Sequence, residues 1–494
     1  MTKRANWLIF IPSNFRKEKI MWQVDKNKKE PFYRQIINHI IQEIESGNLL
    51  AGDKLSPERK LARDYNVNRS TIAHALDELV SLGWITRRQG SGTEVASGPL
   101  LNRQTPKANW QQLWTSPFLK EDPYIQKLKE IQSNSDCIDL YTGELPKEII
   151  PDFQFPAISW DKVMQEKEKR DITGYIPLKN VISKNLENTL HIDMSIQDLL
   201  ITSGSTQGIS LLMRTLLESG DMLATEDPSF LANLPLFASL GIRLIEIPQD
   251  NEGIIPEELE RILISRKIKL LYLNPSYQNP TGLTMPLIRR KEIIEVCSKY
   301  QVPIIEDDVF SELAFHKSPT TLKELSPQTV IYLGSLSKIF GSTIKIGWLL
   351  APKNIIHNLA SAKKRMDSQT EIFPQLLATT ALTQPDYQSK QKKLLSQLTK
   401  KSTTFEKEAS MVSSDWKFQS IEGGLYYWMT YLGKPLKIKD WDLFLQEKVL
   451  IAPSFLFSSN CQSFRLNYTR LTENNIQEFF KALERITDKL KSRR

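Results

Sequence analysis

The sequence predicts an α/β protein with two folded parts, a small winged helix-turn-helix domain and a large body with a mostly parallel central sheet. Residues 31–95 show helical periodicity, a tight turn and an alternating segment that contains glycine. From residue 136 onward, short apolar strand patterns that run into polar loops alternate with helical patterns. The predicted boundaries are an N-terminal extension over 1–24, the winged domain over 25–95, a linker over 96–135 and the body over 136–494.

Composition and cysteine usage restrict the class of protein. The 494 residues are 40% hydrophobic and 25% charged, which is ordinary for a chain of two or three domains. The formal net charge of +8 is compatible with a polyanionic partner, although it is weak support for one. Cys137, Cys297 and Cys461 are far apart and no histidine is spaced for a metal, so we expect a reducing compartment and no metal site.

The N-terminal segment is not expected to target a membrane. No apolar run approaches the roughly 20 residues of a membrane helix, and the apolar WLIFIP is too short for a secretion signal. We therefore expect a cytoplasmic protein without a membrane partner. Residues 1–20 also look unlike the domain start that begins at Met21. A translation start at Met21 is one interpretation of that change, and it leaves the earlier residues without a structural role.

Three helical patterns make up the winged domain. The first ends before Gly47, and its apolar positions recur at three and four residues. Those positions are Ile36, Ile37, Ile40, Ile41 and Ile44. Ser56 offers an N-cap and Pro57 a first helical position for a short second helix. After a turn at 66–68, a third helix runs to Gly83. Its apolar face consists of Ile72, Ala75, Leu76, Leu79 and Val80.

The segment GWITRRQGSGTEV alternates and turns at Gly90 and Gly92, which predicts a β-hairpin wing. A bare helix-turn-helix pattern occurs in many small helical domains, but residues 31–95 resemble the DNA-binding domain of the GntR family almost without gaps. The resemblance implies a double-stranded DNA operator as partner, read by the start of the third helix. The side chains expected to meet DNA are Arg59, Asn68, Arg69, Ser70, Thr71, Arg87, Arg88 and Gln89.

In the body, one loop carries a lysine that could act as a nucleophile. Lys338 follows the apolar run 330–335 and stands among small hydroxyl and glycine residues. An amine that attacks an aldehyde must lose its proton, which apolar flanks and the nearby Lys345 favour. The hydroxyls of Ser335 and Ser337 would suit a phosphate beside it. Lys338 is therefore a candidate Schiff-base lysine, and a solvated surface lysine is the alternative.

Three upstream stretches share this strand-then-loop form, at residues 200–212, 271–282 and 304–313. In this order with Lys338, they resemble the fold type I enzymes of pyridoxal 5′-phosphate, and the class I and II aminotransferases in particular. The resemblance covers about residues 136–490. It implies pyridoxal 5′-phosphate as the cofactor, covalent attachment at Lys338 as the catalytic residue, and a small C-terminal α/β subdomain.

The same resemblance assigns residues to the cofactor phosphate. Ser205, Thr206 and Gln207 would begin a helix whose free N-terminal amides and dipole attract the phosphate. Lys345 stands where relatives place an arginine that clamps the phosphate, so a point charge replaces a bidentate fork.

Four further residues would surround the cofactor ring and its ligand. Phe230 would stack on the ring, and Asn279 would hydrogen-bond the ring oxygen O3′. Asp307 would keep the ring nitrogen protonated, without which the ring is a poor electron sink. Arg465 would take the α-carboxylate of a substrate or effector through its planar fork.

The order of head, linker and body resembles the MocR-type subgroup of GntR-family transcriptional regulators. This implies a homodimer whose body senses a small amine, an amino acid or a B6 vitamer at Lys338. An active aminotransferase with an attached DNA-binding domain is the alternative, and a regulator that has lost its cofactor is a third. Phe310 stands where relatives place a tyrosine that donates to O3′. That departure favours slow exchange, so weak transaminase activity would accompany a mainly regulatory role.

Overall fold

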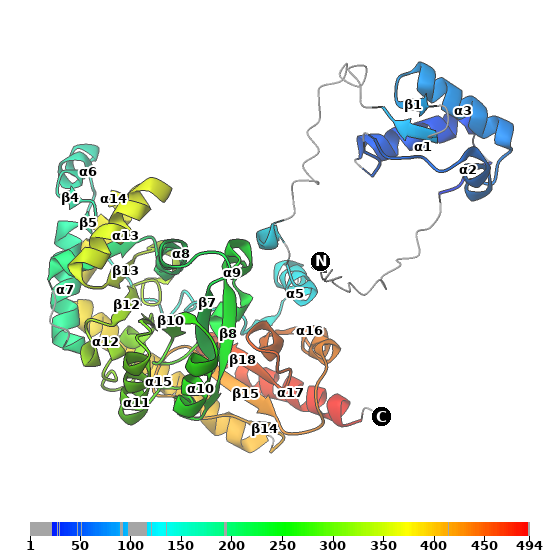
Figure 1. The fold of residues 1–494 in the computed structure, drawn as a ribbon. Helices are drawn as coiled ribbons and strands as arrows, with labels where there is room; N and C mark the ends of the chain where they lie inside the picture. The colour runs from blue at the N-terminus through cyan, green and yellow to red at the C-terminus, as the bar shows by residue number, and fades with distance from the viewer. Residues whose placement is uncertain are drawn as a thin grey trace, which may run out of the picture. The chain divides into compact units, whose positions relative to one another are not determined.

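The computed structural model describes residues 22–26, 28, 30–46, 48–50, 52–88, 92–96, 116–119, 121–134, 136–191, 195–412 and 414–492. The chain divides into two compact units, residues 1–116 and 117–494, which are described separately here (Figure 1). Residues 1–21 of the proposed extension, Gln89 and the predicted turn residue Gly90 on the wing, and the linker tryptophans Trp110 and Trp114 lie outside the described residues.

The described residues of the first unit form three α-helices and a two-stranded sheet. The elements are α1 (Phe32–Glu45), α2 (Glu58–Asp64), α3 (Arg69–Ser81), β1 (Ile85–Arg88) and β2 (Gly92–Val95). The two strands pair antiparallel, with Ile85 opposite Val95, so the expected hairpin wing is present. The core also includes Val24, and His39 stacks on Trp22 with ring centroids 4.1 Å apart. The folded unit therefore includes residues that precede the expected boundary at 25.

Two details of the helix predictions are wrong. Pro57, and not Ser56, occupies the N-cap position of α2, and no side chain caps that helix end. Val80 is 37% exposed, whereas Ile72 and Leu79 on the same helix are buried. The face of α3 that packs on α1 is thus narrower than the apolar pattern predicted, because Val80 lies at the edge of the stripe to which Ile72 and Leu79 belong.

The second unit is built on an eight-stranded sheet with the order β6-β13-β12-β11-β10-β7-β8-β9. Strands β12, β11, β10, β7 and β8 run parallel to their neighbours in this series, β13 is antiparallel to both of its neighbours, and β9 is antiparallel to β8. The bounds are β6 (Leu199–Thr202), β7 (Met222–Asp227), β8 (Arg243–Asp250), β9 (Gly253–Ile254), β10 (Ile268–Leu273), β11 (Ile304–Asp308), β12 (Val330–Ser335) and β13 (Gly347–Leu350). Strands β11 and β12 are buried at every position, as expected of a sheet that is covered on both faces.

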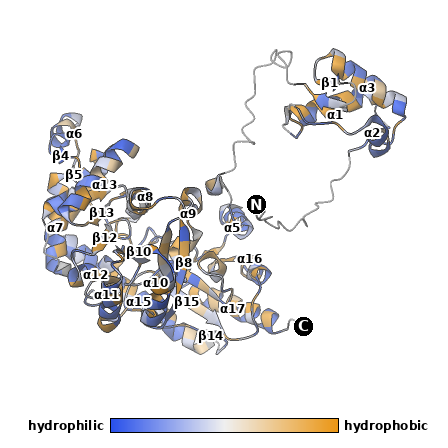
Figure 2. Ribbon diagram, viewed as in Figure 1, coloured by the Kyte–Doolittle hydropathy of each residue, from blue (hydrophilic) through white to orange (hydrophobic). Residues whose placement is uncertain are grey.

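Helices connect these strands and cover the sheet. They are α6 (Trp160–Lys167), α7 (Ile176–Leu190), α8 (Ser205–Leu216), α9 (Pro235–Leu240), α10 (Pro256–Ser265), α11 (Leu287–Lys299), α12 (Leu322–Leu325), α13 (Lys353–Met366) and α14 (Ile372–Leu382). Apolar residues concentrate in the strands at the middle of the unit (Figure 2). Among the described residues, no helix combines the length and apolar character that a membrane crossing needs.

A smaller subdomain, coloured orange to red in Figure 1, follows the central sheet. Its four-stranded antiparallel sheet has the order β14-β15-β18-β17. Its elements are α15 (Tyr387–Val412), β14 (Trp416–Lys417), β15 (Tyr426–Tyr431), α16 (Asp442–Gln446), β16 (Val449–Leu450), β17 (Ala452–Pro453), β18 (Ser463–Asn467) and α17 (Ile476–Lys491). Earlier in the chain, β3 (Ile138–Asp139) pairs with β16, and β4 (Arg170–Asp171) pairs with β5 (Gly174–Tyr175).

Part of the segment that we expected to be a linker is helical. Helix α5 spans Pro123–Asn134, and its Tyr124 and Leu128 are buried in the core of the small subdomain. The Tyr124 hydroxyl donates to the backbone oxygen of Ile451 at 3.2 Å. Only one narrow face of this helix is buried, and most of residues 123–134 are polar. The sequence pattern therefore did not predict the helix.

Candidate functional site

Lys338 lies in the loop that follows the buried strand β12. Its Nζ donates to the backbone oxygen of Gly143 at 2.9 Å and lies 5.4 Å from the ring centroid of Phe310. The hydroxyl of Tyr426 donates to the same Gly143 oxygen at 3.3 Å. A Cβ on Gly143 would lie 2.6 Å from that hydroxyl, so any other residue there would displace the end of the Tyr426 side chain. The lysine is thus held between the central sheet and β15 of the small subdomain.

Asp307 lies at the C-terminal end of β11 and is 5% exposed. The hydroxyl of Tyr272, on the neighbouring strand β10, donates to its Oδ2. Its Oδ1 is buried and has no hydrogen-bond partner. Burial raises the pKa of Asp307 to about 7; the Tyr272 hydrogen bond and the charge of Lys338 counter that rise, and Asp308 adds to it. An unpartnered buried carboxylate oxygen beside Lys338 fits a protonated ring nitrogen, so the residues present fit pyridoxal phosphate.

Asn274 connects Asp307 with Asn279. Its Nδ2 donates to the backbone oxygen of Asp307 at 2.6 Å, and its Oδ1 accepts the backbone N–H of Asn279 at 2.7 Å. The backbone N–H of Phe230 in turn donates to the backbone oxygen of Asn279 at 3.2 Å. Three of the predicted ring-binding residues therefore lie on loops that are bonded to one another, although they come from different parts of the chain.

Arg465 projects from β18 and is 7% exposed. Its Nη1 donates to Oδ1 of Asn279 at 2.8 Å, and its Nη2 donates to the backbone oxygen of Tyr141 at 3.0 Å. The guanidinium carbon lies 4.3 Å from the ring centroid of Tyr426 and 5.1 Å from that of Phe457. The planar group is thus fixed between two aromatic rings, and its buried Nε has no hydrogen-bond partner.

The start of α8 lies close to the loop that carries Lys338. The helix begins at Ser205, after Gly204 with a φ of +84°. A Cβ on Gly204 would lie 3.9 Å from the Ser337 hydroxyl, and one on Gly347 would lie 2.8 Å from the Ser205 nitrogen. The free amides of the helix start and the loop of Lys338 therefore converge.

The other residues predicted to hold the phosphate differ in whether their side chains already have hydrogen-bond partners. The Gln207 side chain accepts the Ser203 N–H at 2.7 Å and donates to Asp367, so it holds the entry of α8. The Ser335 hydroxyl accepts the Ser337 N–H at 3.1 Å and thereby shapes the loop itself. Lys345 is exposed and follows the same loop, and Thr206 is the second residue of α8.

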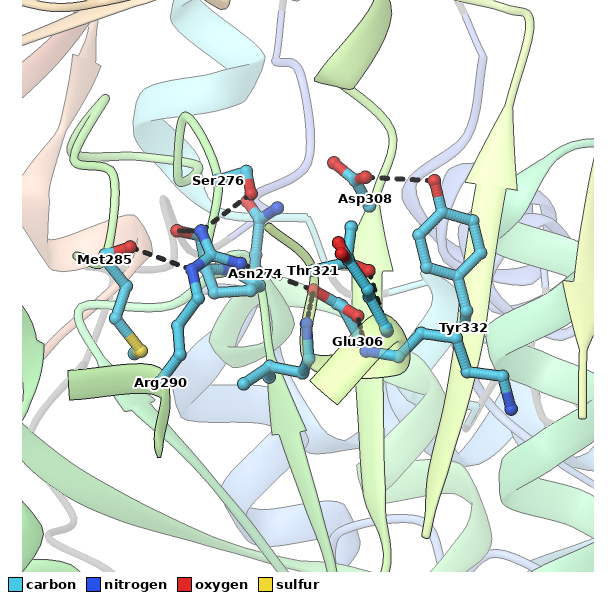
Figure 3. Close-up of polar contacts among 12 residues, drawn as sticks. Asn274, Ser276, Met285, Arg290, Glu306, Asp308, Thr321 and Tyr332 are labelled. Carbon is cyan, nitrogen blue, oxygen red and sulfur yellow. Dashed lines mark hydrogen bonds and ion pairs between the residues drawn. The ribbon is translucent and has the colours of Figure 1, made fainter. Parts of the chain in front are cut away.

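A network of buried charged residues is centred on Arg290 and Glu306 (Figure 3). Arg290 is fully buried, pairs with Glu306 at 3.4 Å and donates to the backbone oxygen of Met285 at 2.8 Å. Glu306 also accepts the N–H groups of Leu322 and Lys323, each at 2.8 Å. Burial raises the pKa of Glu306 to about 7. This network ties β11 to the start of α12 and fixes the strand end that carries Asp307.

Sequence reasoning missed Tyr272, Gly143, Tyr426 and Asn274. Tyr272 and Asn274 lie in or beside the LYLNPSYQNPTG stretch but carry no chemistry that spacing alone reveals. Among the described residues, no cluster of three or more His, Cys, Asp or Glu side chains could hold a metal ion.

In the first unit, the residues expected to meet DNA lie at the start of α3, on α2 and on the wing. Arg59, Asn68, Arg69 and Ser70 are exposed, and Thr71 is half-buried. Asn68 makes no side-chain capping hydrogen bond, so its amide remains available at the helix start. Arg87 pairs with Asp77 at 2.6 Å and with Glu58 at 3.2 Å, and Arg88 ends β1.

Comparisons with known proteins agree with this two-part organisation. Residues 135–483 match the family described as aminotransferase class I and II, and residues 32–95 match the bacterial regulatory proteins of the gntR family. The chain is 36% identical over 380 residues to the HTH-type transcriptional regulator YdfD of Bacillus subtilis, covering 76% of this chain and 78% of that protein. It is 31% identical over 484 residues to the HTH-type transcriptional regulator YisV of the same organism, covering 93% and 97%.

Among solved structures, kynurenine aminotransferase of Pyrococcus horikoshii, crystallised in complex with PMP, is similar to the body. The TM-score is 0.68 at 27% identity, and the match covers 78% of this chain and 99% of that one.

Proposed function

Since the chain belongs to the class I and II aminotransferase family and carries a GntR-family domain ahead of that body, we propose that it is a pyridoxal phosphate-dependent transcriptional regulator. Its body would sense a small amine, an amino acid or a B6 vitamer, and its head would bind an operator in double-stranded DNA. The observation that carries the proposal is the unpartnered Asp307 oxygen beside Lys338, in a chain whose relatives are named as regulators.

The residues at the sheet edge would divide the work of holding the cofactor. When bound, pyridoxal phosphate supplies an aldehyde that reacts reversibly with amines and a ring that withdraws electrons. The amides at the start of α8, the Ser337 hydroxyl and Lys345 would hold its phosphate. Asp307 would hold a proton at the ring nitrogen, Asn279 would face O3′, and Phe230 would stack on the ring.

Effector recognition would rest on Arg465 and Lys338. The guanidinium is already oriented by Asn279 and by the Tyr141 carbonyl, so it presents a preorganised fork to a carboxylate. Lys338 would carry the cofactor at its Nζ, the atom that donates to the Gly143 oxygen in this structure. Because the same oxygen accepts from the Tyr426 hydroxyl of the small subdomain, a change at Lys338 would alter a contact of that subdomain.

The residues near Lys338 favour the regulator over the alternative, an active aminotransferase with an attached DNA-binding domain. Phe310 is 1% exposed and packs edge-on against Tyr426 with centroids 5.7 Å apart, and it offers no hydroxyl. A site without that donor suits an exchange of amines more than rapid turnover. A homodimer that places two heads on paired half-sites would complete the regulator.

One experiment separates the two functions. Purified full-length protein is titrated with pyridoxal phosphate and then with a panel of amino acids, while visible absorbance and binding to a duplex selected from a random pool are measured together. The regulator is expected to bind the cofactor and to change its DNA affinity with an amine. Conversion of the amino acid without a change in DNA affinity would favour the aminotransferase.

Two variants anchor that experiment. Lys338→Ala should lose the visible absorbance of the lysine-bound cofactor, whereas Lys299→Ala, an exposed lysine that pairs with Glu260, should keep it. An unchanged spectrum in Lys338→Ala would place the attachment on another lysine, and no binding of the cofactor by the wild type would overturn the proposal.

A further inference from the structure

Two tyrosine–aspartate pairs flank the buried strand β11. Tyr272 of β10 donates to Oδ2 of Asp307, and Tyr332 of β12 donates to Oδ2 of Asp308 at 2.9 Å (Figure 3 shows the second pair). In the register of the sheet, Tyr272 lies opposite Ile305, and Tyr332 lies opposite Glu306. Because successive residues of a strand point to opposite faces, the two pairs lie on opposite faces of the sheet.

The two pairs differ in their surroundings. Asp307 is influenced by the charge of Lys338, and Asp308 by that of Arg290. The Tyr272 pair therefore lies on the side of the predicted cofactor ring, and the Tyr332 pair lies on the side of the Arg290–Glu306 network. Both tyrosines are 1% exposed, so burial does not distinguish them.

We propose that Tyr272 is a positioning residue, whose hydroxyl fixes Oδ2 of Asp307 so that Oδ1 faces the cofactor's ring nitrogen as a charged carboxylate. This inference rests on the proposed function, because it requires pyridoxal phosphate at this site. It assigns a role to a side chain that touches Asp307 rather than the ring itself.

Electrostatics make the hydroxyl necessary. Burial is the largest influence on Asp307 and raises its pKa to about 7, and Asp308 raises that pKa further. Only the Tyr272 hydrogen bond and the Lys338 charge favour the ionised form. Glu226, on β7, is a further buried acid whose pKa is raised by burial and by Asp307. Without the hydroxyl, a larger share of Asp307 would be neutral, and a neutral acid attracts a protonated ring nitrogen less.

Tyr272 is also suited to remain a donor throughout. Burial and the charge of Asp307 raise the pKa of its phenol well above the ordinary value, so it does not ionise at physiological pH. Its aromatic ring belongs to the core of the central sheet, and a phenylalanine would preserve that packing. The hydroxyl can thus be removed with little change in shape.

The test compares Tyr272→Phe with the matched control Tyr332→Phe in the full-length protein, loaded with pyridoxal phosphate that is ¹⁵N-labelled in the ring. Wild type and Tyr332→Phe are expected to show the ¹⁵N chemical shift of a protonated ring. Tyr272→Phe should move that shift toward unprotonated pyridine and weaken cofactor binding by a factor of about 10. A purely structural role would lower the unfolding midpoint without moving the ring shift.

An ¹⁵N chemical shift and a cofactor affinity in Tyr272→Phe that equal those of the wild type would overturn the inference. Equal changes in Tyr272→Phe and in Tyr332→Phe would also overturn it. A wild type that binds no cofactor would overturn the proposed function as well. If Tyr272→Phe does not fold, a difluorotyrosine in place of Tyr272, a stronger donor of similar size, should tighten cofactor binding, and unchanged binding would overturn the inference.

Discussion

Arg69 and Arg87 share one carboxylate, although Arg69 lies on α3 and Arg87 lies on β1 of the wing. Arg69 Nε lies 3.1 Å from Oε2 of Glu58, and Arg87 Nη2 lies 3.2 Å from Oε1 of the same side chain. Glu58 thus joins the start of α2 to both elements that are expected to meet DNA. These groups are partly exposed, so each pair stabilises the fold by about 0–1 kcal/mol and can exchange for a phosphate or a base edge.

Arg69→Ala should weaken binding to the selected operator by about 1–3 kcal/mol if its guanidinium, at the start of α3, reads a base edge. The measurement is a set of binding titrations on the operator and on duplexes with single base changes. Arg243→Ala, an exposed arginine on β8 of the body, serves as the control. An equal loss on every duplex would identify Arg69 as a phosphate contact instead.

Arg465→Lys should weaken the binding of amino-acid effectors by about 10-fold or more, because an ammonium cannot reproduce a bidentate fork. Amines that lack a carboxylate provide the internal control, and their affinity should change little. Titrations followed by visible absorbance measure both classes. Equal losses for amines with and without a carboxylate would contradict the assigned role of Arg465.

Phe310→Tyr should accelerate amino-group transfer by about 10-fold, the effect of one added hydrogen bond near the reacting atoms. The ring already lies 5.4 Å from Lys338 Nζ, so the new hydroxyl would enter the same space. Single-turnover kinetics with one amino acid measure the rate in the variant and in the wild type. An unchanged rate would show that the missing hydroxyl does not limit turnover.

Glu226→Gln should change the pH dependence of stability in the cofactor-free protein. Burial raises the pKa of Glu226 from 4.5 to about 7, so Glu226 keeps its proton to a higher pH in the folded state than in the unfolded state. The stabilising contribution of this group is complete below pH 4.5 and is lost as the pH rises through about 7.

Glutamine does not titrate, so the wild type should lose stability relative to Glu226→Gln across that pH interval. Urea unfolding midpoints at several pH values measure the difference. Parallel profiles for the two proteins would mean that Glu226 ionises at its ordinary pKa.

Local patterns predicted much of the head because its helices are short and their neighbours are close in sequence. The spacing of Ile36, Ile37 and Ile40 correctly gave the buried face of α1. The exposure of Val80 could not be predicted in the same way, since Val80 lies at the edge of the apolar stripe and its burial depends on how α3 packs on its neighbours. Likewise, the pattern of 123–134 did not reveal that Tyr124 packs into a core made mostly by residues far along the chain.

The sequence by itself determined the two-part organisation and the strand-then-loop stretches of the body, and it predicted Lys338 as the candidate attachment residue, because apolar periodicity and short motifs are local properties of the chain. Only the tertiary structure decided that the Tyr272 hydroxyl donates to Asp307 and that Arg465 lies between two aromatic rings. It also decided that the Gly143 oxygen accepts hydrogen bonds from both Lys338 and Tyr426. Those contacts join residues from separate strands and loops, and their energies depend on burial, which exists only once the sheet and the small subdomain have packed.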